Sequence, residues 1–430
     1  MELREPSSKY LVKPRYKQTE VGVIPVDWEV MQLKQISPSQ TVGLVINPST
    51  HVTADGVVPM LVGSNIKPNK IEWEAARRIS EGSNQALPAS QLFSGDLVVV
   101  RVGEPGITAV VPPELDGCNC ASVMIVRQHI GFDSQWLCYV MNSKAGLAQI
   151  AGVQYGTAQK QFNISDAVNF KYATPSVFEQ RAIAEALSDT DALIESLDQL
   201  IAKKRDLKQG AMQELLTGKK RLPGFSGEWK VRYLDDVSWF QEGPGVRAWQ
   251  FTASGMKLLN GTNIVRGVLN LDSTNRYISE AEAKGAYSHF LADEGDIVIA
   301  SSGITVEKFH EKVAFVTKVD LPFCMNTSTI RFKTNQGILA PAFLFHILTS
   351  DMFKRAIGGQ ATGSAQLNFG PSHIAKVQVV LPEYGEQTVI ATILSDMDTE
   401  LAELQSRLAK ARQIKQGMMQ ELLTGRIRLI

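Results

Sequence analysis

The side chains that could do chemistry in this sequence are thinly spread, and none stands in a catalytic spacing. The Cys-x-Cys step at Cys118 and Cys120 lacks the two-residue gap of a zinc ligand pair, and the six histidines show no ligand spacing. The Gly-Glu-Pro-Gly segment at 103–106 lacks the glycine spacing and the lysine of a phosphate-binding loop. We therefore expect reduced thiols, no metal site and no cofactor bound by this chain.

Polar and basic side chains follow short apolar runs, such as 97–100 and 297–299, in positions typical of loops between strands. Such loops could donate hydrogen bonds to phosphates or to base edges, where arginine favours guanine and asparagine or glutamine favours adenine. A solvated side chain or a turn hydrogen bond is the alternative for each residue. The candidates for nucleic-acid contact are Asn65, Lys67, Arg101, Gly156, Thr157, Gln159 and Lys160 in the first half, and Asn263, Arg266, Ser301, Ser302, Lys308, Lys312, Ser364 and Gln366 in the second half.

Charge gives no basic footprint, because 44 basic and 44 acidic residues cancel over the 430-residue chain. The segments 1–175 and 223–385 each carry 15 residues of each sign, so a positive surface has to come from folding or from partner subunits. The first residues lack the apolar core of a signal peptide, and no window approaches the ~20 apolar residues of a membrane span. We expect a cytoplasmic protein.

An internal duplication organises the chain. Residues 179–222 align without a gap to 386–429, an offset of 207, and 24 of the 44 positions are identical. Weaker matches continue upstream, including Trp28 with Trp229, which we expect to anchor the first strand of each copy. Each half is therefore a variable globular region followed by a nearly identical segment.

The repeated segments carry the apolar heptads of paired helices. A lysine, Lys208 or Lys415, occupies the same seam position in each copy, where it either fixes register or extends to solvent along its aliphatic stem. The residues expected to pair the helices are Leu187, Ile194, Leu197, Ile201 and Leu215 in the first copy, and Leu394, Leu401, Leu404, Leu408 and Leu422 in the second copy.

Capping signals delimit these helices. Ser176 with Glu179 three residues later forms a capping box, and Gly218 and Gly425 stand where a left-handed C-cap is expected. Gly210 and its counterpart in the second copy are poor helix formers that mark a close backbone approach or a kink. Roughly 40 residues at ~1.5 Å each would give rods of about 60 Å.

Two similar rods in one chain can pair if they run antiparallel, which would give the chain a pseudo-twofold internal repeat. The predicted fold class is α+β, with two similar α/β globular domains separated by two long antiparallel coiled-coil helices. The predicted domains are 1–175 (first globular domain), 176–222 (central helix), 223–382 (second globular domain) and 383–430 (C-terminal helix).

The sequence resembles the specificity subunits of type I restriction-modification systems. The similarity lies in the doubled order of globular domain and helix, in the Leu-Leu-Thr-Gly endings, and in the helix starts at Pro175, Glu179–Ala184, Leu187–Ser188 and Asp191, which recur at Pro382, Glu386–Gln387, Ile390–Ala391, Leu394–Ser395 and Asp398. One departure is Gln180-Arg181, which becomes Gln387-Thr388 in the second copy.

The resemblance implies that each globular domain reads one half of a bipartite, asymmetric site in double-stranded DNA. The helices would set the gap between the halves and dock two methyltransferase subunits, which two motor-nuclease subunits would join. S-adenosylmethionine, ATP and magnesium would then belong to the partners, and this chain would be a non-catalytic subunit.

Two other functions remain open from the sequence. One is the specificity subunit of a type II system in which a single partner both methylates and cuts, and neighbouring genes would separate the two cases. The other is a coiled-coil scaffold with two protein-binding heads, which predicts no salt-sensitive DNA affinity, whereas phosphate contacts predict steep salt dependence.

Overall fold

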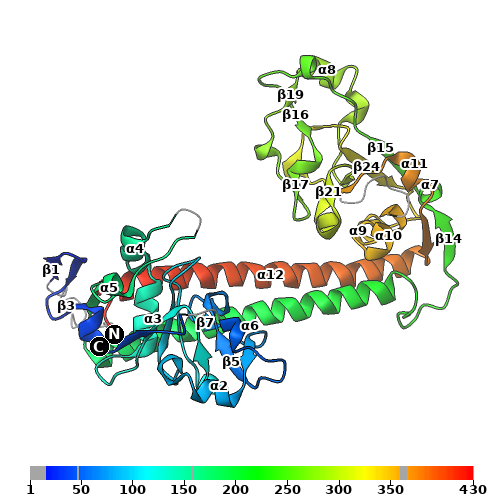
Figure 1. The fold of residues 1–430 in the computed structure, drawn as a ribbon. Helices are drawn as coiled ribbons and strands as arrows, with labels where there is room; N and C mark the ends of the chain where they lie inside the picture. The colour runs from blue at the N-terminus through cyan, green and yellow to red at the C-terminus, as the bar shows by residue number, and fades with distance from the viewer. Residues whose placement is uncertain (1–15, 46–47, 157–158, 359–365, 430) are drawn as a thin grey trace, which may run out of the picture. The chain divides into compact units, whose positions relative to one another are not determined.

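The computed structural model describes residues 16–45, 48–156, 159–358 and 366–429, and the chain forms two compact units of mixed α/β structure (Figure 1). The first unit comprises residues 1–197 with 407–430, and the second comprises residues 198–406. Each unit therefore combines a globular domain from one half of the chain with part of a long helix from the other half.

The strands of the first unit are β1 (Tyr16–Thr19), β2 (Gly22–Pro25), β3 (Glu29–Gln32), β4 (Gln40–Val42), β5 (Val58–Leu61), β6 (Ile66–Lys67), β7 (Lys70–Ile71), β8 (Arg77–Ile79), β9 (Leu97–Val100), β10 (Thr108–Val110), β11 (Asn119–Cys120), β12 (Val123–Val126) and β13 (Lys171–Thr174). Its short helices are α1 (Leu33–Ile36), α2 (Glu81–Gln85), α3 (Ser134–Asn142), α4 (Lys144–Val153) and α5 (Ile164–Ala167).

A four-stranded antiparallel sheet of order β10-β9-β12-β4 forms the centre of the first globular domain. Its strand β9 is buried on both faces. Leu97 and Val99 pack in the cluster that includes the helices, and Val98 and Val100 pack in a separate cluster on the opposite face. Burial on both faces explains why this strand is an unbroken apolar run rather than an alternating one.

The strands of the second unit are β14 (Lys230–Tyr233), β15 (Ser238–Glu242), β16 (Met256–Leu259), β17 (Ile264–Val265), β18 (Val268–Leu269), β19 (Tyr277–Ile278), β20 (Ile297–Ala300), β21 (Ile304–Thr305), β22 (Val313–Phe315), β23 (Cys324–Met325), β24 (Thr329–Thr334), β25 (Gln366–Leu367) and β26 (Gln378–Leu381). Its short helices are α7 (Leu234–Val237), α8 (Glu280–Lys284), α9 (Pro341–Leu348), α10 (Asp351–Gly358) and α11 (Pro371–Ile374).

The second globular domain repeats the sheets of the first. Its four-stranded sheet has the order β22-β20-β24-β15, which matches β10-β9-β12-β4 strand for strand. The three-stranded sheet β19-β16-β23 likewise matches β8-β5-β11, and the pair β14 with β26 matches β3 with β13. The duplication found in the sequence is therefore also a duplication of topology.

Two helices of 39 residues each, α6 (Val177–Leu215) and α12 (Tyr384–Leu422), follow the two globular domains. In the first unit the start of α6 and the end of α12 share one core, which contains Leu187 and Leu422. In the second unit the end of α6 and the start of α12 share the other, with Leu215 and Leu394. Within each unit the two helices therefore run antiparallel.

Of the ten residues expected to pair the helices, nine are buried and Ile194 is half-buried. Gly218 and Gly425 both adopt a φ of 70°, which is the left-handed cap expected after each helix. Gly210 and Gly417 have no heavy atom within 4 Å of the place a Cβ would take, so close backbone approach is not the reason for either glycine.

No helix within the described ranges is long and apolar enough to cross a membrane.

Candidate nucleic-acid interface

A clamp joins the start of α6 to the residues that follow α12. The carboxylate of Glu179 is 1% exposed and accepts hydrogen bonds from Arg428 Nε at 2.5 Å, Arg428 Nη2 at 2.7 Å and Trp28 Nε1 at 3.0 Å. Arg428 also binds Asp27 with two hydrogen bonds of 2.8 and 3.0 Å. These carboxylates raise the pKa of Arg428, and Arg428 lowers that of Asp27.

The second unit carries the same clamp, in which Glu386 stands 207 residues after Glu179, Arg221 stands 207 residues before Arg428, and Trp229 takes the part of Trp28. Glu386 is 1% exposed and accepts two hydrogen bonds of 2.9 Å from Arg221 and one of 3.2 Å from Trp229 Nε1. Each clamp thus ties the beginning of one long helix to the segment just beyond the other. The predicted capping box is only half formed, because Ser176 Oγ accepts from Glu179 N while the Glu179 carboxylate belongs to the clamp.

The seam lysines are paired rather than extended to solvent. Lys415 binds Asp191 in the first unit, and Lys208 binds Asp398 in the second unit. Tyr139 on α3 donates a hydrogen bond of 2.7 Å to the same Asp191, so a residue of the globular domain joins the pair. An ion pair that depends on one register of two antiparallel helices fixes that register.

His346 on α9 takes the place of Tyr139 in the second unit. The Nε2 atom of His346 lies 3.0 Å from Ser395 Oγ on α12. Ser395 corresponds to Ser188 on α6, whose Oγ lies 3.2 Å from Tyr139 Oη in the first unit. Burial lowers the pKa of His346 to about 4, and the positive charge of Lys208 acts in the same direction. The contact between α9 and α12 in the second unit therefore contains the neutral imidazole of His346.

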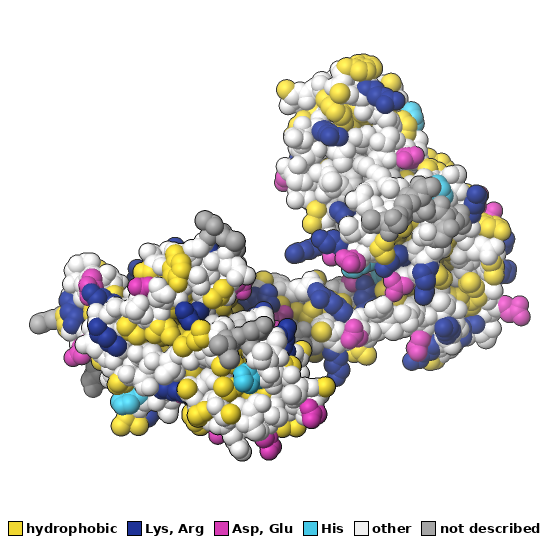
Figure 2. All heavy atoms as spheres, in the orientation of Figure 1, with side chains coloured by type: hydrophobic (Ala, Val, Ile, Leu, Met, Phe, Trp, Pro, Cys, Tyr) yellow, Lys and Arg dark blue, Asp and Glu magenta, His cyan; other side chains and the backbone are white. Residues whose placement is uncertain are grey.

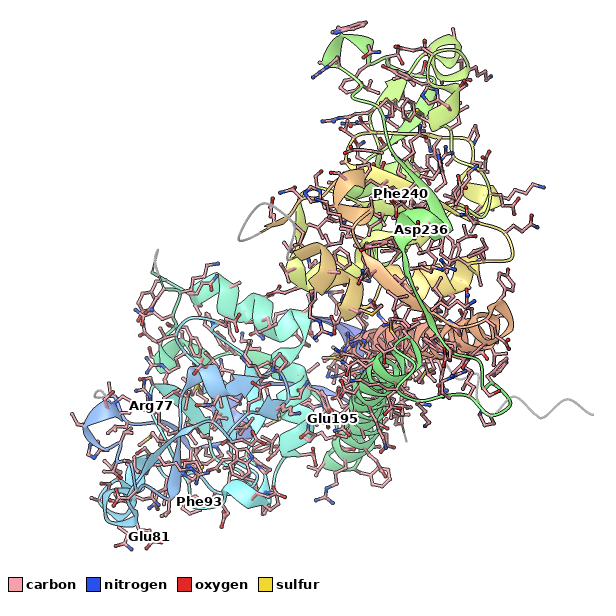
Figure 3. The ribbon with its side chains drawn as sticks, turned by 90° about the vertical axis from the view of Figure 1, so that its right-hand side faces the viewer. Arg77, Glu81, Phe93, Glu195, Asp236 and Phe240 are labelled. Atoms are coloured by element: carbon pink, nitrogen blue, oxygen red, sulfur yellow. The ribbon has the colours of Figure 1, made fainter. Side chains whose placement is uncertain are left out.

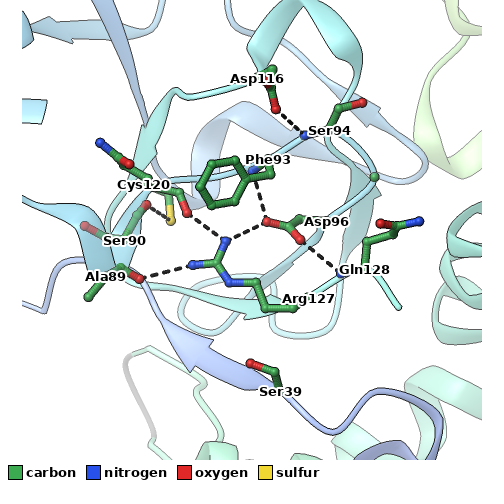
Figure 4. A network of polar contacts seen from close by, with 12 residues as sticks. Ser39, Ala89, Ser90, Phe93, Ser94, Asp96, Asp116, Cys120, Arg127 and Gln128 are labelled. Carbon is green, nitrogen blue, oxygen red and sulfur yellow. Dashed lines mark hydrogen bonds and ion pairs between the residues drawn. The ribbon is translucent and has the colours of Figure 1, made fainter. Parts of the chain in front are cut away.

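Another repeated ion pair supports the loops of each globular domain (Figure 4). Asp96 accepts hydrogen bonds from Arg127 at 2.6 Å and from the backbone amides of Phe93 and Gln128, both at 3.0 Å. In the second domain Arg331 binds Asp296 at 3.2 Å. Asp96 and Asp296 are therefore equivalent buried residues that anchor a loop to the sheet in each domain.

The two candidate asparagines have their side chains engaged by the backbone. Asn65 Oδ1 accepts from Val62 N at 3.0 Å, and its Nδ2 donates to Glu72 O at 3.0 Å. Asn263 is 4% exposed, and its Oδ1 accepts from Asn260 N at 3.0 Å. Both residues close a short turn after a strand, which is the alternative role that the sequence left open.

The remaining candidates of the first domain lie in two places. Lys67 ends β6 and is half-buried, and Arg101, also half-buried, directly follows β9. Gly156 has a φ of 96°, and a Cβ there would lie 2.2 Å from Gln159 O, so the turn requires glycine. Gln159 and Lys160 are exposed beside it, whereas Thr157 lies outside the described residues.

In the second domain the candidates differ in exposure. Ser301 is 1% exposed, with its hydroxyl donating to Thr327 O at 3.3 Å, whereas Ser302 is exposed. Arg266 is exposed in the turn between β17 and β18, with a φ of 52°. Lys308 is exposed on the short 3-10 helix Val306–Lys312, Gln366 is exposed on β25, and Ser364 lies outside the described residues.

Three of these candidates meet in one hollow. Asn263, Ser302 and Lys312 line a cavity of about 440 Å³ in the second domain. Arg276 and Asn260 line it too, and the sequence analysis missed both.

Charge is mixed on the visible surface of both units. On the face shown in Figure 2, Lys and Arg side chains are interspersed with Asp and Glu and do not form a single patch. Glu195 on α6, labelled in Figure 3, forms an ion pair of 2.9 Å with Lys70 of the globular domain. The described residues contain no cluster of three metal-ligating side chains.

The fold and its paired clamps define a duplicated mixed α/β protein whose two globular domains repeat the same sheets and share two long helices. Residues 226–412 match the family model of the type I restriction modification DNA specificity domain. The chain is 24% identical over 427 residues to the type I restriction enzyme MjaVIII specificity subunit of Methanocaldococcus jannaschii, with 94% of each chain covered. The putative MjaX specificity subunit of the same organism is 23% identical over 449 aligned positions, with 98% of each covered.

Solved structures agree in fold. The S subunit of the type I restriction-modification system from M. genitalium superposes with a TM-score of 0.58 at 15% identity, covering 92% of this chain and 96% of that chain. A chain from a study of complex assembly and conformational transition in a type I R-M system gives 0.56 at 16% identity, covering 94% and 99%. The family match and the two relatives confirm the resemblance to type I specificity subunits that the sequence predicts, and the solved structures show a shared fold.

Proposed function

We propose that this chain is the DNA sequence-specificity subunit of a type I restriction-modification complex. Each globular domain reads one half of a bipartite, asymmetric DNA site. The observation that carries the proposal is the match of residues 226–412 to a DNA specificity domain, in a chain whose first half repeats the same sheet order.

The candidate residues have two kinds of role in this proposal. Exposed side chains on loops contact DNA, namely Gln159, Lys160, Arg266, Ser302, Lys308 and Gln366. Residues already bonded to the protein, such as Asn65, Asn263 and Ser301, hold the loops in position. Phosphate contacts set the register of a protein on DNA, and contacts with base edges supply its specificity.

The long helices act as a spacer between two readers in this proposal, with the predicted domain boundaries at 175, 222 and 382. Two methyltransferase subunits dock on the chain, and two motor-nuclease subunits join through them. The chain itself contributes DNA affinity and target specificity, while S-adenosylmethionine, ATP and magnesium are used by the partners. The type I relatives, similar over nearly their whole length, favour this function over that of a type II specificity subunit or a coiled-coil scaffold.

The spacer role is tested by shortening both helices equally. Deleting residues 196–202 and 403–409 removes one heptad from the middle of each helix and leaves both clamps and both seam lysine pairs intact. A loss of seven residues shortens each helix by ~10 Å, which corresponds to about three base pairs of DNA.

We expect the gap between the half-sites to shrink by about that amount while the bases of each half-site stay the same. The modified sites of the assembled complex give the readout. Altered half-site bases with an unchanged gap would contradict the division of labour between domains and helices.

A further inference from the structure

The cavity in the second globular domain has the composition of an anion site. It lies beside the ends of β16 and β20 and holds about 440 Å³. Two cations, Arg276 and Lys312, line it, and no aspartate or glutamate is found among its described lining residues. The other polar side chains are amides and hydroxyls, among them those of Asn260, Asn275, Ser302 and Ser328.

Lys312 is half-buried, and no carboxylate of the described residues forms an ion pair with its Nζ, although the charge of the adjacent Glu311 acts on it. The Nζ of Lys312 donates to Ile264 O at 2.6 Å and to Gly261 O at 3.2 Å, which leaves one N–H for a ligand. The ion pairs found among the described residues do not include it. Burial lowers its pKa, which means that the site destabilises its charged form when nothing else is bound. A bound anion would compensate that charge.

Arg276 is exposed at the rim and is held by an aromatic ring rather than by a carboxylate. Its guanidinium lies 5.3 Å from the centre of the Phe251 ring, and its backbone carbonyl accepts from Leu258 N at 3.0 Å. Stacking on a ring leaves the guanidinium N–H groups free, and their fork matches two oxygens of a phosphate.

The first globular domain lacks half of this arrangement. Arg77, labelled in Figure 3, is the first residue of β8 and corresponds to Arg276, which directly precedes β19. Its side chain donates a hydrogen bond of 3.2 Å to Ser49 Oγ. The residue directly before β10, however, is Ile107, where Lys312 directly precedes β22. Likewise Val62 precedes the Gly-Ser-Asn turn of the first domain, where Asn260 precedes the Gly-Thr-Asn turn of the second.

We propose that the cavity binds one phosphodiester group of the DNA strand read by the second domain, with Arg276 and Lys312 as its two cationic contacts. The inference rests on the proposed function of the chain and assigns a contact to that surface. Because a phosphate is the same at every base pair, the cavity supplies affinity and register and carries no base preference. The first domain binds its half-site without this contact.

The test uses the full chain assembled with its methyltransferase partner and measures DNA affinity between 50 and 200 mM salt. Arg276→Gln removes the rim cation, and Lys312→Ile places there the residue that the first domain uses. We expect each substitution to weaken binding by roughly tenfold and to reduce the slope of log affinity against log salt by about 0.9. Lys284→Gln is the matched control, because this exposed lysine on α8 pairs with Glu280 outside the cavity.

Neutral methylphosphonates placed one at a time in the half-site of the second domain locate the contact. We expect one position to weaken binding of the wild-type complex, and the same position to leave Arg276→Gln unaffected. Inorganic phosphate, titrated at constant ionic strength without DNA, tests whether the cavity serves free phosphate instead of DNA. A shift of the thermal unfolding midpoint that Arg276→Gln abolishes, together with a DNA affinity that Arg276→Gln leaves unchanged, would identify a site for free phosphate and overturn the proposal.

The outcomes separate this inference from the proposed function. A wild-type complex without salt-sensitive DNA affinity contradicts the proposed function itself. Wild-type binding with a steep salt slope that Arg276→Gln leaves unchanged overturns only the cavity proposal, and so does a variant that changes base preference at one position. Arg276 is exposed, so its variant decides the question even where Lys312→Ile fails to fold.

Discussion

The clamp at the start of α6 predicts a large and local effect of one substitution, Arg428→Met. Glu179 is 1% exposed and takes two of its three side-chain hydrogen bonds from Arg428. Removing the partner of a buried charge costs about 3–5 kcal/mol, because the remaining charge stays out of water without compensation. At ~1.4 kcal/mol per factor of ten, hydrogen exchange from this part of the first unit should accelerate roughly 150- to 4,000-fold.

Hydrogen exchange followed by mass spectrometry measures this effect with an internal control. Peptides from residues 177–190 report the altered clamp, and peptides from 384–397 report the intact clamp of Glu386 with Arg221. Arg221→Met should reverse the pattern. Adding Glu179→Gln to Arg428→Met removes the buried charge and should restore most of the protection.

An acceleration of less than tenfold at 177–190 in Arg428→Met would contradict this role of the clamp. Equal acceleration in both peptides would also contradict it, because the damage would then not be confined to one clamp.

Two further predictions concern single residues. The pKa of His346 is lowered to about 4 from 6.5, so the unfolded chain takes up the proton before the folded chain does as pH falls. The free energy of unfolding of the second unit should therefore be complete above pH 6.5 and decrease by ~3 kcal/mol between pH 6.5 and 4. His346→Tyr, which installs the residue found at Tyr139, should remove that dependence in denaturant unfolding followed across this pH range. Gly156→Ala should lower the thermal unfolding midpoint of the first unit by the equivalent of at least about 1 kcal/mol, because the turn has a φ of 96° and the new Cβ would meet Gln159 O. An unchanged midpoint in calorimetry would show that the turn relaxes at no cost.

The long helices could be predicted because their signals are local and doubled. A gapless repeat with apolar heptads defines α6 and α12, and Gly218 and Gly425 mark their ends. The similar globular domains followed from weaker matches, such as Trp28 with Trp229. Trp229 directly precedes the first strand of its domain, β14, as expected, whereas Trp28 precedes β3, which follows β1 and β2.

The clamps could not be predicted, because they join residues that are distant in sequence. Arg428 lies 249 residues from Glu179, and a capping box explains the same glutamate from local sequence alone. The internal repeat did contain a signal, because an arginine recurs at 221 and 428 although the residues just before it differ between the two copies. An acidic residue at each helix start and an arginine just beyond each helix end, both repeated in the two copies, would indicate such a clamp.

The polar candidates of the loops illustrate a different limit. Residue type alone cannot separate Asn263, whose amide is used by backbone groups, from Ser302, which is exposed on the same cavity. The turn role of the asparagines has a local basis, because Gly-x-Asn directly after an apolar run favours a tight turn closed by the asparagine side chain. The cavity has no such local signal in the sequence, because Arg276 and Lys312 come together only when the strands between them have paired.

The most direct test of the specificity role is a map of modified adenines. The chain is expressed together with its methyltransferase partner in a host free of DNA methylation. The unaltered chain is compared with a variant in which residues 1–175 are exchanged for those of a relative. We expect one bipartite motif with a fixed gap, and the exchange should change only one half of it. A soluble complex that modifies nothing, or an exchange that alters both halves, would contradict the account.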